Sequence, residues 1–359
     1  MWFIRKLCYS LLVLWGVASL VFTLFSVIPG DPALVVLGPR AGQAEIEQFH
    51  HQTGTDRPWI KQYLHYINDL SPISIHHATN PKHLLYLNTD VYTSFIPVVS
   101  VSHYKIILKA PYLRTSYISK TPVSSIIADS WPETALLAFT AILLATLLGI
   151  AIGIWFAVTT WHKLRSAVFV GIQIFGISTP SFFIALLFAW LFGYVWSSYT
   201  GLSPTGSLYE VDNLKGPVLA WHNLILPLIT LSLRPMSIIV QITQASFQDV
   251  LASDYIRTAR ALGFSNLRIL TRYALKNALN PVVTAISGWL ASLLAGAVFI
   301  ERIFNWKGIG NEVVEALNNS DLPVVMGCTL FFAFLFVCIN SAVDVIYRWL
   351  DPRIKINLL

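Results

Sequence analysis

Long apolar stretches constrain this chain more than any other feature of its sequence. Six of them occur, at residues 7–28, 134–158, 167–196, 224–247, 281–300 and 324–343, and Arg234 is the one charged side chain that they contain. A helix that crosses a bilayer needs about 20 consecutive, mostly apolar residues. Each stretch reaches that length, so the sequence predicts an all-α integral membrane protein with six transmembrane helices.

The composition agrees with a membrane protein and excludes other classes. Hydrophobic residues make up 55% of the 359 residues and charged residues only 12%, whereas soluble domains carry about 25% charged residues. The net charge of +6 is small, and basic residues in such a chain indicate cytoplasmic loops rather than a nucleic-acid partner. Cys8, Cys328 and Cys338 lie in or beside apolar stretches, so we expect small buried side chains and no disulfide.

Basic residues in the short loops predict the orientation of the chain. Lys and Arg residues precede the first stretch, occur in loops 159–166 and 248–280, and follow residue 344. Cytoplasmic loops carry an excess of such residues, so we expect all four segments inside and both termini in the cytoplasm. The first stretch is longer than the apolar part of a signal peptide, and no small-residue cleavage pattern precedes Pro29. We therefore expect a retained helix over residues 1–28.

The segment between the first two stretches, residues 29–133, is too long to be a structureless loop. Residues 43–52 and the segment after Pro58 have helical patterns, and residues 98–108 are rich in β-branched and aromatic side chains, which is typical of one or two strands. The sequence therefore predicts an N-terminal helix at 1–28, a small α/β outside subdomain at 29–133, and a membrane domain at 134–359 that contains the inside loop 248–280.

Catalytic motifs are absent from the sequence. The dipeptide Gly-Lys does not occur, so there is no P-loop for ATP, and neither H-E-x-x-H nor G-x-S-x-G is present. Seven of the nine histidines lie in the predicted outside subdomain, including His50-His51 and His76-His77, but adjacent histidines in a polar loop point in different directions. We therefore predict no catalytic residue, no metal site and no cofactor.

The inside loop 253–280 has the pattern of two short helices. Ser253 and Ser265 stand where helix caps are expected, and Gly263 can take the left-handed conformation that ends a helix. The second helix would carry an apolar face and a basic stripe, formed by Leu267, Leu270, Ala274, Leu275 and Ala278 and by Arg268, Arg272 and Lys276. Such a knob either docks onto a partner protein or lies on anionic headgroups, and its pattern alone favours neither.

The first helix of this loop resembles a family motif. Asp254-Tyr255-Ile256-Arg257-Thr258-Ala259-Arg260-Ala261-Leu262-Gly263 is similar to the "EAA" loop of binding-protein-dependent ABC importer permeases, of the oligopeptide, dipeptide and nickel type. Arg257-Thr258-Ala259 replaces the Glu-Ala-Ala of the general motif, and residues 72–122 match no part of the family pattern. Further segments resemble the same family in the same order: Pro29-Gly30-Asp31-Pro32, Asp56-Arg57-Pro58, Gln62-Tyr63, Ser178-Thr179-Pro180-Ser181-Phe182, Asn277-Ala278-Leu279-Asn280-Pro281, Gly296-Ala297-Val298, Trp306-Lys307-Gly308-Ile309-Gly310 and Asp351-Pro352-Arg353.

The resemblance implies a type I ABC importer permease fold in a bacterial inner membrane. It implies a second homologous permease subunit, two cytosolic ATP-binding subunits and a periplasmic solute-binding protein as partners, with the lipid bilayer around the spans. The chain would move di- or oligopeptides by alternating access, without being an enzyme itself; nickel or another small solute is the alternative cargo. The resemblance assigns ATPase coupling to Asp254, Tyr255, Arg257, Thr258, Ala259, Arg260 and Gly263. A membrane-anchored interaction protein that uses its outside subdomain is the alternative from another class.

Two further sets of residues are candidates for the transport path or for helix packing. Arg234 lies near the middle of its span, where a charge costs at least about 2.5–3.5 kcal/mol and faces protein or water. It is either a pathway cation for peptide carboxylates or a structural cation for carbonyl groups freed near Pro235. The second set consists of small residues, which let helices approach closely: Gly149 and Gly153, and Gly288, Ser292 and Gly296. The close approach is within one subunit, at a seam between two permeases, or along the pore.

Overall fold

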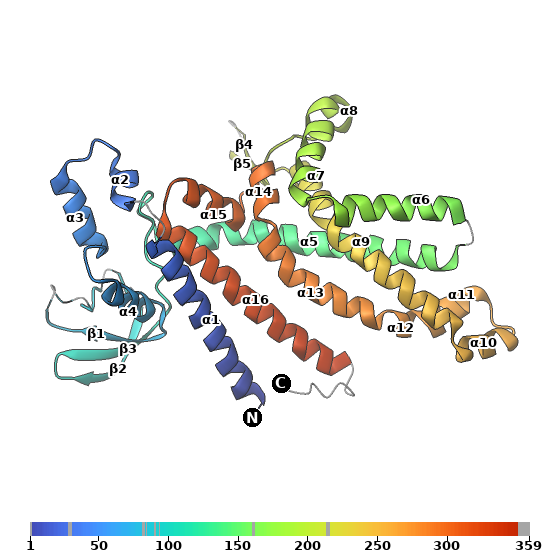
Figure 1. The fold of residues 1–359 in the computed structure, drawn as a ribbon, viewed down its shortest axis with the longest axis horizontal. Helices are drawn as coiled ribbons and strands as arrows, with labels where there is room; N and C mark the ends of the chain where they lie inside the picture. Colours follow the sequence, from blue (N-terminus) through green and yellow to red (C-terminus); the bar gives the residue numbers. More distant parts are fainter. Residues whose placement is uncertain are drawn as a thin grey trace. The chain divides into compact units, whose positions relative to one another are not determined.

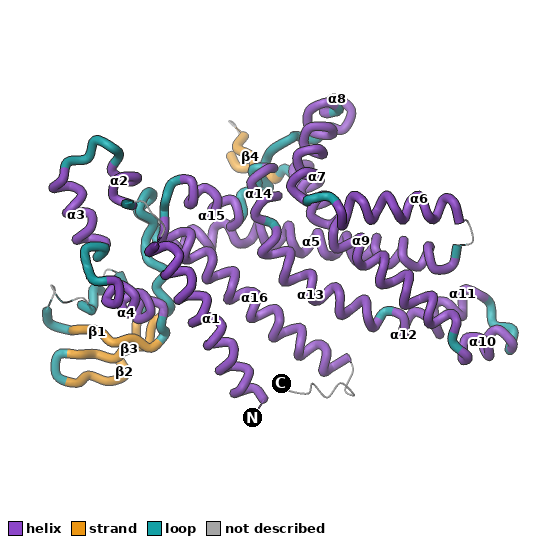
Figure 2. Tube along the Cα trace, in the orientation of Figure 1, coloured by secondary structure: helices purple, strands orange, loops and turns teal. Residues whose placement is uncertain are grey.

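The chain divides into two compact units in the computed structural model (Figure 1). The structure describes residues 2–27, 31–80, 83, 85–89, 91–92, 94–159, 162–212 and 216–350. The first unit comprises residues 1–129 and 312–334, and the second comprises 130–311 and 335–359. Helices make up most of the described chain (Figure 2). Pro29 and Gly30 of one family-like segment, and the whole of Asp351-Pro352-Arg353, lie outside the described residues.

Among the described residues, four helices are long and apolar enough to cross a membrane. They are α1 (Trp2–Val27), α5 (Val123–Val158), α9 (His222–Ala252) and α16 (Leu322–Leu350). Helix α5 begins 11 residues before the predicted stretch at 134 and continues through Pro132. These four helices confirm four of the predicted spanning segments.

The predicted span at 167–196 is broken rather than straight. It consists of α6 (His162–Gln173) with the π-helical turn η1 (Ile174–Ser178), followed by α7 (Ser181–Phe188) with η2 (Ala189–Val195), and the two halves are bent by 109°. The break falls at Thr179, which is extended with φ −94° and ψ 134° before Pro180. A residue that precedes proline avoids the helical region, so the Thr179-Pro180 pair explains the bend.

The predicted span at 281–300 is divided as well. Helix α13 (Asn280–Gly296) has 17 residues and gives way at Ala297 to α14 (Val298–Phe304). The described chain therefore has four spanning helices, or five if the bent pair crosses as one. The count of six spans stays a prediction.

The first unit contains the predicted small α/β part. Its helices are α2 (Pro32–Leu37), α3 (Gln43–Thr53) and α4 (Trp59–Leu70), and Gly54 ends α3 in the left-handed conformation. Strands β2 (Phe95–Val101) and β3 (Tyr104–Lys109) confirm the strand pattern, while β1 (Ile73–His77) was not predicted. The sheet is antiparallel in the order β1-β3-β2.

A buried carboxylate holds this sheet to α4. Asp69, at the end of α4, accepts hydrogen bonds from the hydroxyl of Tyr92 at 2.8 Å and from Nε of Arg114 at 3.2 Å. Its backbone carbonyl accepts a bond from the ammonium group of Lys109, which is buried in β3. The Arg114 guanidinium and the Tyr92 hydroxyl thus compensate for the burial of the Asp69 carboxylate, while Lys109 satisfies the backbone carbonyl of the same residue.

In the second unit, α9 is packed by helices on several sides. Gly149 and Gly153 of α5 lie directly against it: a Cβ at these positions would come within 2.7 Å of Ile239 and 2.5 Å of Thr243. A larger buried cluster joins α5, α7, α9, α13 and α14 around residues such as Leu137, Leu293 and Trp306.

The remaining elements of the described chain are α8 (Ser197–Thr200), the hairpin β4 (Tyr209–Asp212) and β5 (Gly216–Leu219), α10 (Asp254–Ala261), α11 (Asn266–Arg268), η3 (Ile269–Ala274), α12 (Leu275–Ala278) and α15 (Ile309–Asn318).

Candidate functional site

The knob, residues 253–280, begins where α9 ends. The carboxylate of Asp254 stands in the first turn of α10, where the helix dipole favours a negative charge. Ser253 does not cap α10 as predicted: its hydroxyl donates to the carbonyl of Val250 at 2.5 Å, in the last turn of α9. Its backbone is extended, with φ −70° and ψ 154°, so Ser253 still turns the chain from one helix into the next.

The end of α10 confirms the prediction made for Gly263. This residue has φ +77° and its N–H donates to the carbonyl of Arg260 at 3.0 Å. The N–H of Phe264 reaches back to the carbonyl of Ala259 at 3.3 Å, which completes the two bonds of a Schellman motif. Residues with a side chain rarely adopt this φ, so a glycine here lets the chain reverse directly after α10.

The second half of the knob is helical but not regular. The hydroxyl of Ser265 accepts the N–H of Arg268 at 3.4 Å, which confirms its predicted capping role. The chain then passes from α11 through the π-helical turn η3 into α12. A π turn inserts one residue into the helical repeat and so rotates the residues that follow it.

This irregularity changes the predicted apolar face. Leu267 is 72% exposed rather than buried, and Ile269, which the helical pattern did not assign to this face, is 2% exposed. Ala274 and Ala278 are buried as predicted. The basic residues Arg268, Arg272 and Lys276 are all exposed.

One face of the knob is packed against the end of α9. Ile256 and Ala259, three residues apart on α10, join a buried cluster with Phe247, Ile269, Ala274 and Ala278. The hydroxyl of Ser246 donates to the carbonyl of Ala278 at 2.8 Å, and the amide of Asn277 donates to the Tyr255 hydroxyl at 3.0 Å. These contacts tie both halves of the knob to one spanning helix.

The opposite face of the knob is open and polar. Asp254 and Arg257 are exposed and form an ion pair at 3.4 Å, and Thr258 and Arg260 of α10 are exposed as well. Leu262, 68% exposed, and Leu267 add two apolar side chains beside the exposed basic groups. An open face that combines cations with a few large apolar groups is suited to bind a protein surface of complementary charge and shape.

Arg234 lies on an open side of α9. Its side chain is exposed, and the structure records no hydrogen bond or ion pair for it with the described residues. Its neighbours Pro235 and Met236 are buried, so the charge points away from the packed side of the helix.

The small residues occupy two different environments. Gly149 and Gly153 contact α9 of the same chain, as described above. Gly288 and Ser292 of α13 are exposed, and a Cβ at Gly288 would meet nothing within 4 Å. Gly296 ends α13, and its surroundings lie outside what the structure describes.

Glu301, which no sequence pattern had marked as a candidate, is fully buried in α14. Its Oε2 accepts the N–H groups of Gly310 at 2.7 Å and Asn311 at 3.2 Å, at the start of α15. Burial raises the pKa of Glu301 to about 7, against the opposing effect of a hydrogen bond from Thr134 and of these N–H donors. A Cβ at Gly308 would lie 2.3 Å from the carboxyl group of Glu301, so only glycine fits at this position. The glycines of the family-like segment Trp306-Lys307-Gly308-Ile309-Gly310 are therefore the sequence signal that could have revealed this contact.

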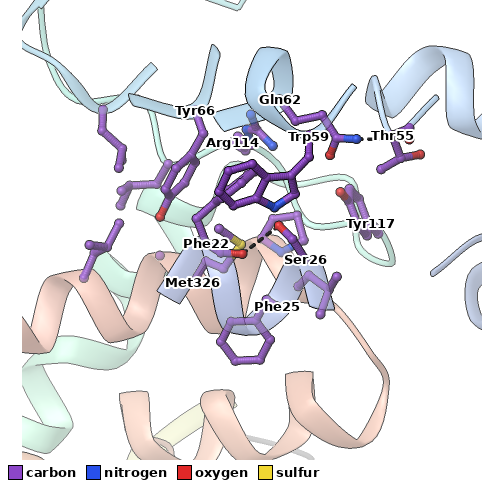
Figure 3. Close-up of a pocket in the computed structure, with 16 residues that line it drawn as sticks. Phe22, Phe25, Ser26, Thr55, Trp59, Gln62, Tyr66, Arg114, Tyr117 and Met326 are labelled. Carbon is purple, nitrogen blue, oxygen red and sulfur yellow. Dashed lines mark hydrogen bonds between the residues drawn. The ribbon is translucent and has the colours of Figure 1, made fainter. Parts of the chain in front are cut away.

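A pocket of about 210 Å³ lies within the first unit (Figure 3). Phe22 of α1, Trp59 and Tyr66 of α4, and Met326 of α16 supply most of its apolar wall, and Arg114 stands over the Tyr66 ring at 5.5 Å. Sites for drug-sized ligands measure about 300–1,000 Å³, so this pocket is small for a peptide. In the described part of the chain, no group of three or more His, Cys, Asp or Glu side chains could hold a metal ion.

The long apolar helices define a multi-pass helical membrane protein. The family model described as "Binding-protein-dependent transport system inner membrane component" matches residues 149–356, and the model of the N-terminal part of such components matches residues 1–81. The chain belongs to this family of binding-protein-dependent inner membrane components. It is thus a permease subunit of the ABC transporter type, and it is not itself catalytic.

Curated relatives match the chain over nearly its whole length. It is 34% identical to the probable D,D-dipeptide transport system permease protein DdpB of Escherichia coli K12, over 98% of this chain and 96% of the relative. It is 32% identical to the glutathione transport system permease protein GsiC of Salmonella choleraesuis, over 94% of each chain. It is 30% identical to the oligopeptide transport system permease protein AppB of Bacillus subtilis, over 98% of each chain.

A solved structure shows the same fold in a more distant protein. An inward-facing form of the MetNI methionine ABC transporter superimposes with a TM-score of 0.51 at 17% sequence identity. The match covers 64% of this chain and 97% of that chain. Since the identity is low, the likeness concerns the fold alone.

Proposed function

We propose that this chain is one permease subunit of an ATP-driven importer for di- or oligopeptides. The observation that carries the proposal is the knob, whose apolar side is fixed to the end of α9 while Asp254, Arg257 and Arg260 remain open. A surface that protrudes from a spanning helix and moves with it can pass a partner's motion to the membrane helices. The peptide cargo is supported by the dipeptide, glutathione and oligopeptide systems to which the relatives belong.

In this proposal six spans of a type I importer fold place both termini and the knob in the cytoplasm. Two cytosolic ATP-binding subunits bind α10 of this chain and its counterpart on a second, homologous permease. A periplasmic solute-binding protein delivers the peptide. The family membership supports both kinds of partner, and ATP-driven closure would switch the path between inward and outward access.

The coupling residues are proposed to act in three ways. Ile256 and Ala259 anchor α10, Gly263 sets its end, and Asp254, Tyr255, Arg257, Thr258 and Arg260 offer the surface for the ATP-binding subunit. The exposed stripe of Gly288 and Ser292 on α13 is proposed to face the second permease or the path. Arg234, exposed on α9, is proposed to attract peptide carboxylates.

Uptake by the reconstituted complex tests the function. Purified permease pair, ATP-binding subunits and solute-binding protein are placed in proteoliposomes, and labelled di-, tri- and pentapeptides are compared with methionine and with Ni²⁺. We expect ATP-dependent uptake of at least one peptide class, suppressed by unlabelled peptide. Uptake of Ni²⁺ or methionine without any peptide uptake would overturn the peptide assignment and leave the family membership intact.

A further inference from the structure

The sheet in the first unit leaves one face uncovered. Residues paired directly across antiparallel strands lie on the same face, and the register gives three such rows. The first row is Ile73, Leu108 and Ile96; the second is Ile75, Ile106 and Val99; the third is His77, Tyr104 and Val101. We call these nine residues the outer sheet face. Seven of them, all except Ile106 and His77, are between 43% and 65% exposed.

The opposite face of the same sheet is covered along β1 and at Ile107 and Lys109 of β3, while Pro97 and Ser100 of β2 are exposed there. Ser74, His76 and Ile107 are fully buried there, and Lys109 is bonded to Asp69. The sheet therefore has its own core on one side and does not need the outer sheet face to fold. Soluble proteins rarely expose a contiguous apolar patch of more than a few hundred Å², and larger ones mark contact surfaces.

The outer sheet face carries no Asp, Glu, Lys or Arg side chain. Its polar members are the phenol of Tyr104 and the imidazole of His77. Loss of solvent and the nearby His83 and His103 lower the pKa of His77, which favours the neutral form of this ring. The face is thus uncharged over all three rows.

A single helix links this sheet to a spanning helix. Helix α4 packs on α1 through Phe22, whose ring centroid lies 5.4 Å from that of Tyr63, and through a hydrogen bond of 2.7 Å between Ser19 and Tyr63. On its other side, Asn68 of α4 bonds both the N–H and the carbonyl of Ile75, at 2.9 and 3.1 Å, and so closes the edge of β1. Figure 1 shows α4 beside both α1 and the strands.

Apolar exposure continues from the sheet towards α1. Ile60 and Leu64, four residues apart on α4, are 65% and 59% exposed, and Trp59 is 46% exposed. Along α1 itself, Leu20 and Leu24 are exposed as expected for a helix in contact with lipid. Trp and Tyr side chains are enriched at the level of the headgroups, and Trp59 and Tyr104 fit that pattern.

We propose that the outer sheet face rests on the lipid bilayer, among the headgroups and upper acyl chains of the leaflet at the C-terminal end of α1. The sheet acts as an interfacial anchor that fixes the first unit to the membrane beside its spanning helix. Lipid is the occupant that the observations favour, because the face is uncharged and adjoins a helix that already contacts lipid. Protein interfaces instead carry about one hydrogen bond per 100–200 Å² and a polar rim.

Spin labels on adjacent residues test this proposal. Val99 lies on the outer sheet face and Ser100 on the opposite side of the same strand, and both are exposed in the single chain. Each is changed to Cys in a chain whose Cys8, Cys328 and Cys338 are replaced, and labelled with a nitroxide. The complete complex is then placed in nanodiscs of phosphatidylethanolamine and phosphatidylglycerol. Collisions with oxygen, which enriches in lipid, are compared with collisions with a water-soluble nickel chelate.

For a sheet that rests on lipid, the ratio of oxygen to nickel collisions is several-fold higher at Val99→Cys than at Ser100→Cys. A label at Val101→Cys gives a second measurement on the same face. Equal, water-like ratios at all three positions would overturn the proposal. A label at Val99→Cys that is immobilised and reached by neither reagent would show a protein partner on this face, which also overturns the lipid assignment.

Discussion

The knob and the sheet subdomain, residues 73–109, each have one packed face and one open face. The open faces of the two regions differ in charge. Each has one face packed on its own unit, through Ile256 and Ala259 in the knob and through Ile107 in the sheet. The open face of the knob carries Asp254, Arg257 and Arg260, whereas the outer sheet face carries no acidic or basic side chain. Burial of one face thus explains why each element folds, and the chemistry of the remaining face is the basis of the two proposals: a protein partner in water for the knob, and lipid for the sheet.

The largest expected difference between the two regions is the side of the membrane from which each is reached. Thr79, which follows β1, and Asn266, which begins α11, are both exposed in the structure. In a chain without its own cysteines, we expect a membrane-impermeant thiol reagent added outside to label Thr79→Cys and to leave Asn266→Cys unlabelled until the cells are opened. Labelling of both from the same side would contradict the proposed orientation and with it the comparison.

The second prediction concerns the backbone of the knob. Proline fixes φ near −65°, and Gly263 has φ +77°, so Gly263→Pro cannot keep the present turn and costs roughly 3 kcal/mol or more. We expect ATP hydrolysis to continue while peptide uptake in proteoliposomes is nearly lost. Gly201→Pro is the matched control, since Gly201 ends α8 with φ +65° outside the knob. A Gly263→Pro complex that binds its ATP-binding subunits and imports at the normal rate would show that the knob does not couple.

The charges on the open face of the knob provide the third test. Reversal of both cations in Arg257→Glu with Arg260→Glu should weaken binding of the ATP-binding subunits about tenfold, since exposed ion pairs contribute roughly 0.2–1 kcal/mol each. Binding is measured by titration of purified ATP-binding subunits onto permease in nanodiscs. Arg257 and Arg260 lie on the open face of the knob, so the variant should still insert into the membrane normally. Arg272→Glu, an exposed cation on η3, serves as the control, and an equal loss there would indicate a general electrostatic effect rather than a docking surface.

Some features of these elements were predicted correctly from the sequence, and others were not. Two patterns that depend on one local conformation were correct, since Gly263 ends α10 and Ser265 caps α11, whereas the hydroxyl of Ser253 bonds Val250 and does not cap α10. The prediction of one regular helix was wrong for this segment: Ile269, the first residue of the π turn η3, is buried, while Leu267 before it is open. The Thr179-Pro180 pair was noted for its family likeness, yet its bend of 109° follows from proline sterics that a count of apolar residues ignores.

Local sequence patterns could not predict contacts between residues that lie apart in the chain. Glu301 meets the N–H groups of Gly310 and Asn311 only because α14 and α15 fold back on each other. The outer sheet face could not be predicted because the pairing of β1 with β3 decides which residues share a side. The periodicity of residues 98–108 predicts strands but does not tell which face is covered.

The fourth prediction tests the lipid side of the comparison. Val99→Asp places a charge on the outer sheet face, and Ser100→Asp places the same charge one residue away on the other side. If lipid covers the outer face, Val99→Asp should destabilise the nanodisc-reconstituted complex by about 1 kcal/mol, since a charge near the bilayer interface loses part of its hydration. Ser100→Asp should have little effect. Thermal unfolding of both variants is compared in nanodiscs and in detergent, and equal stability of the two variants in nanodiscs would contradict lipid contact.

The smallest effect is expected at Arg234, which combines features of both regions because it is an exposed charge within the apolar stretch 224–247 of α9. If it attracts peptide carboxylates across a water-filled path, Arg234→Gln removes an attraction of roughly 1 kcal/mol, which slows uptake about fivefold. Peptides with an amidated C-terminus lack that carboxylate and should lose much less. Uptake of a matched free and amidated peptide, normalised to the amount of permease in the membrane, separates this role from a structural one.

The structure records no partner for Arg234 among the described residues, so a selective loss of uptake of the free peptide is the expected result. An equal loss for both peptides, together with less protein in the membrane, would mean that the cation supports the backbone near Pro235.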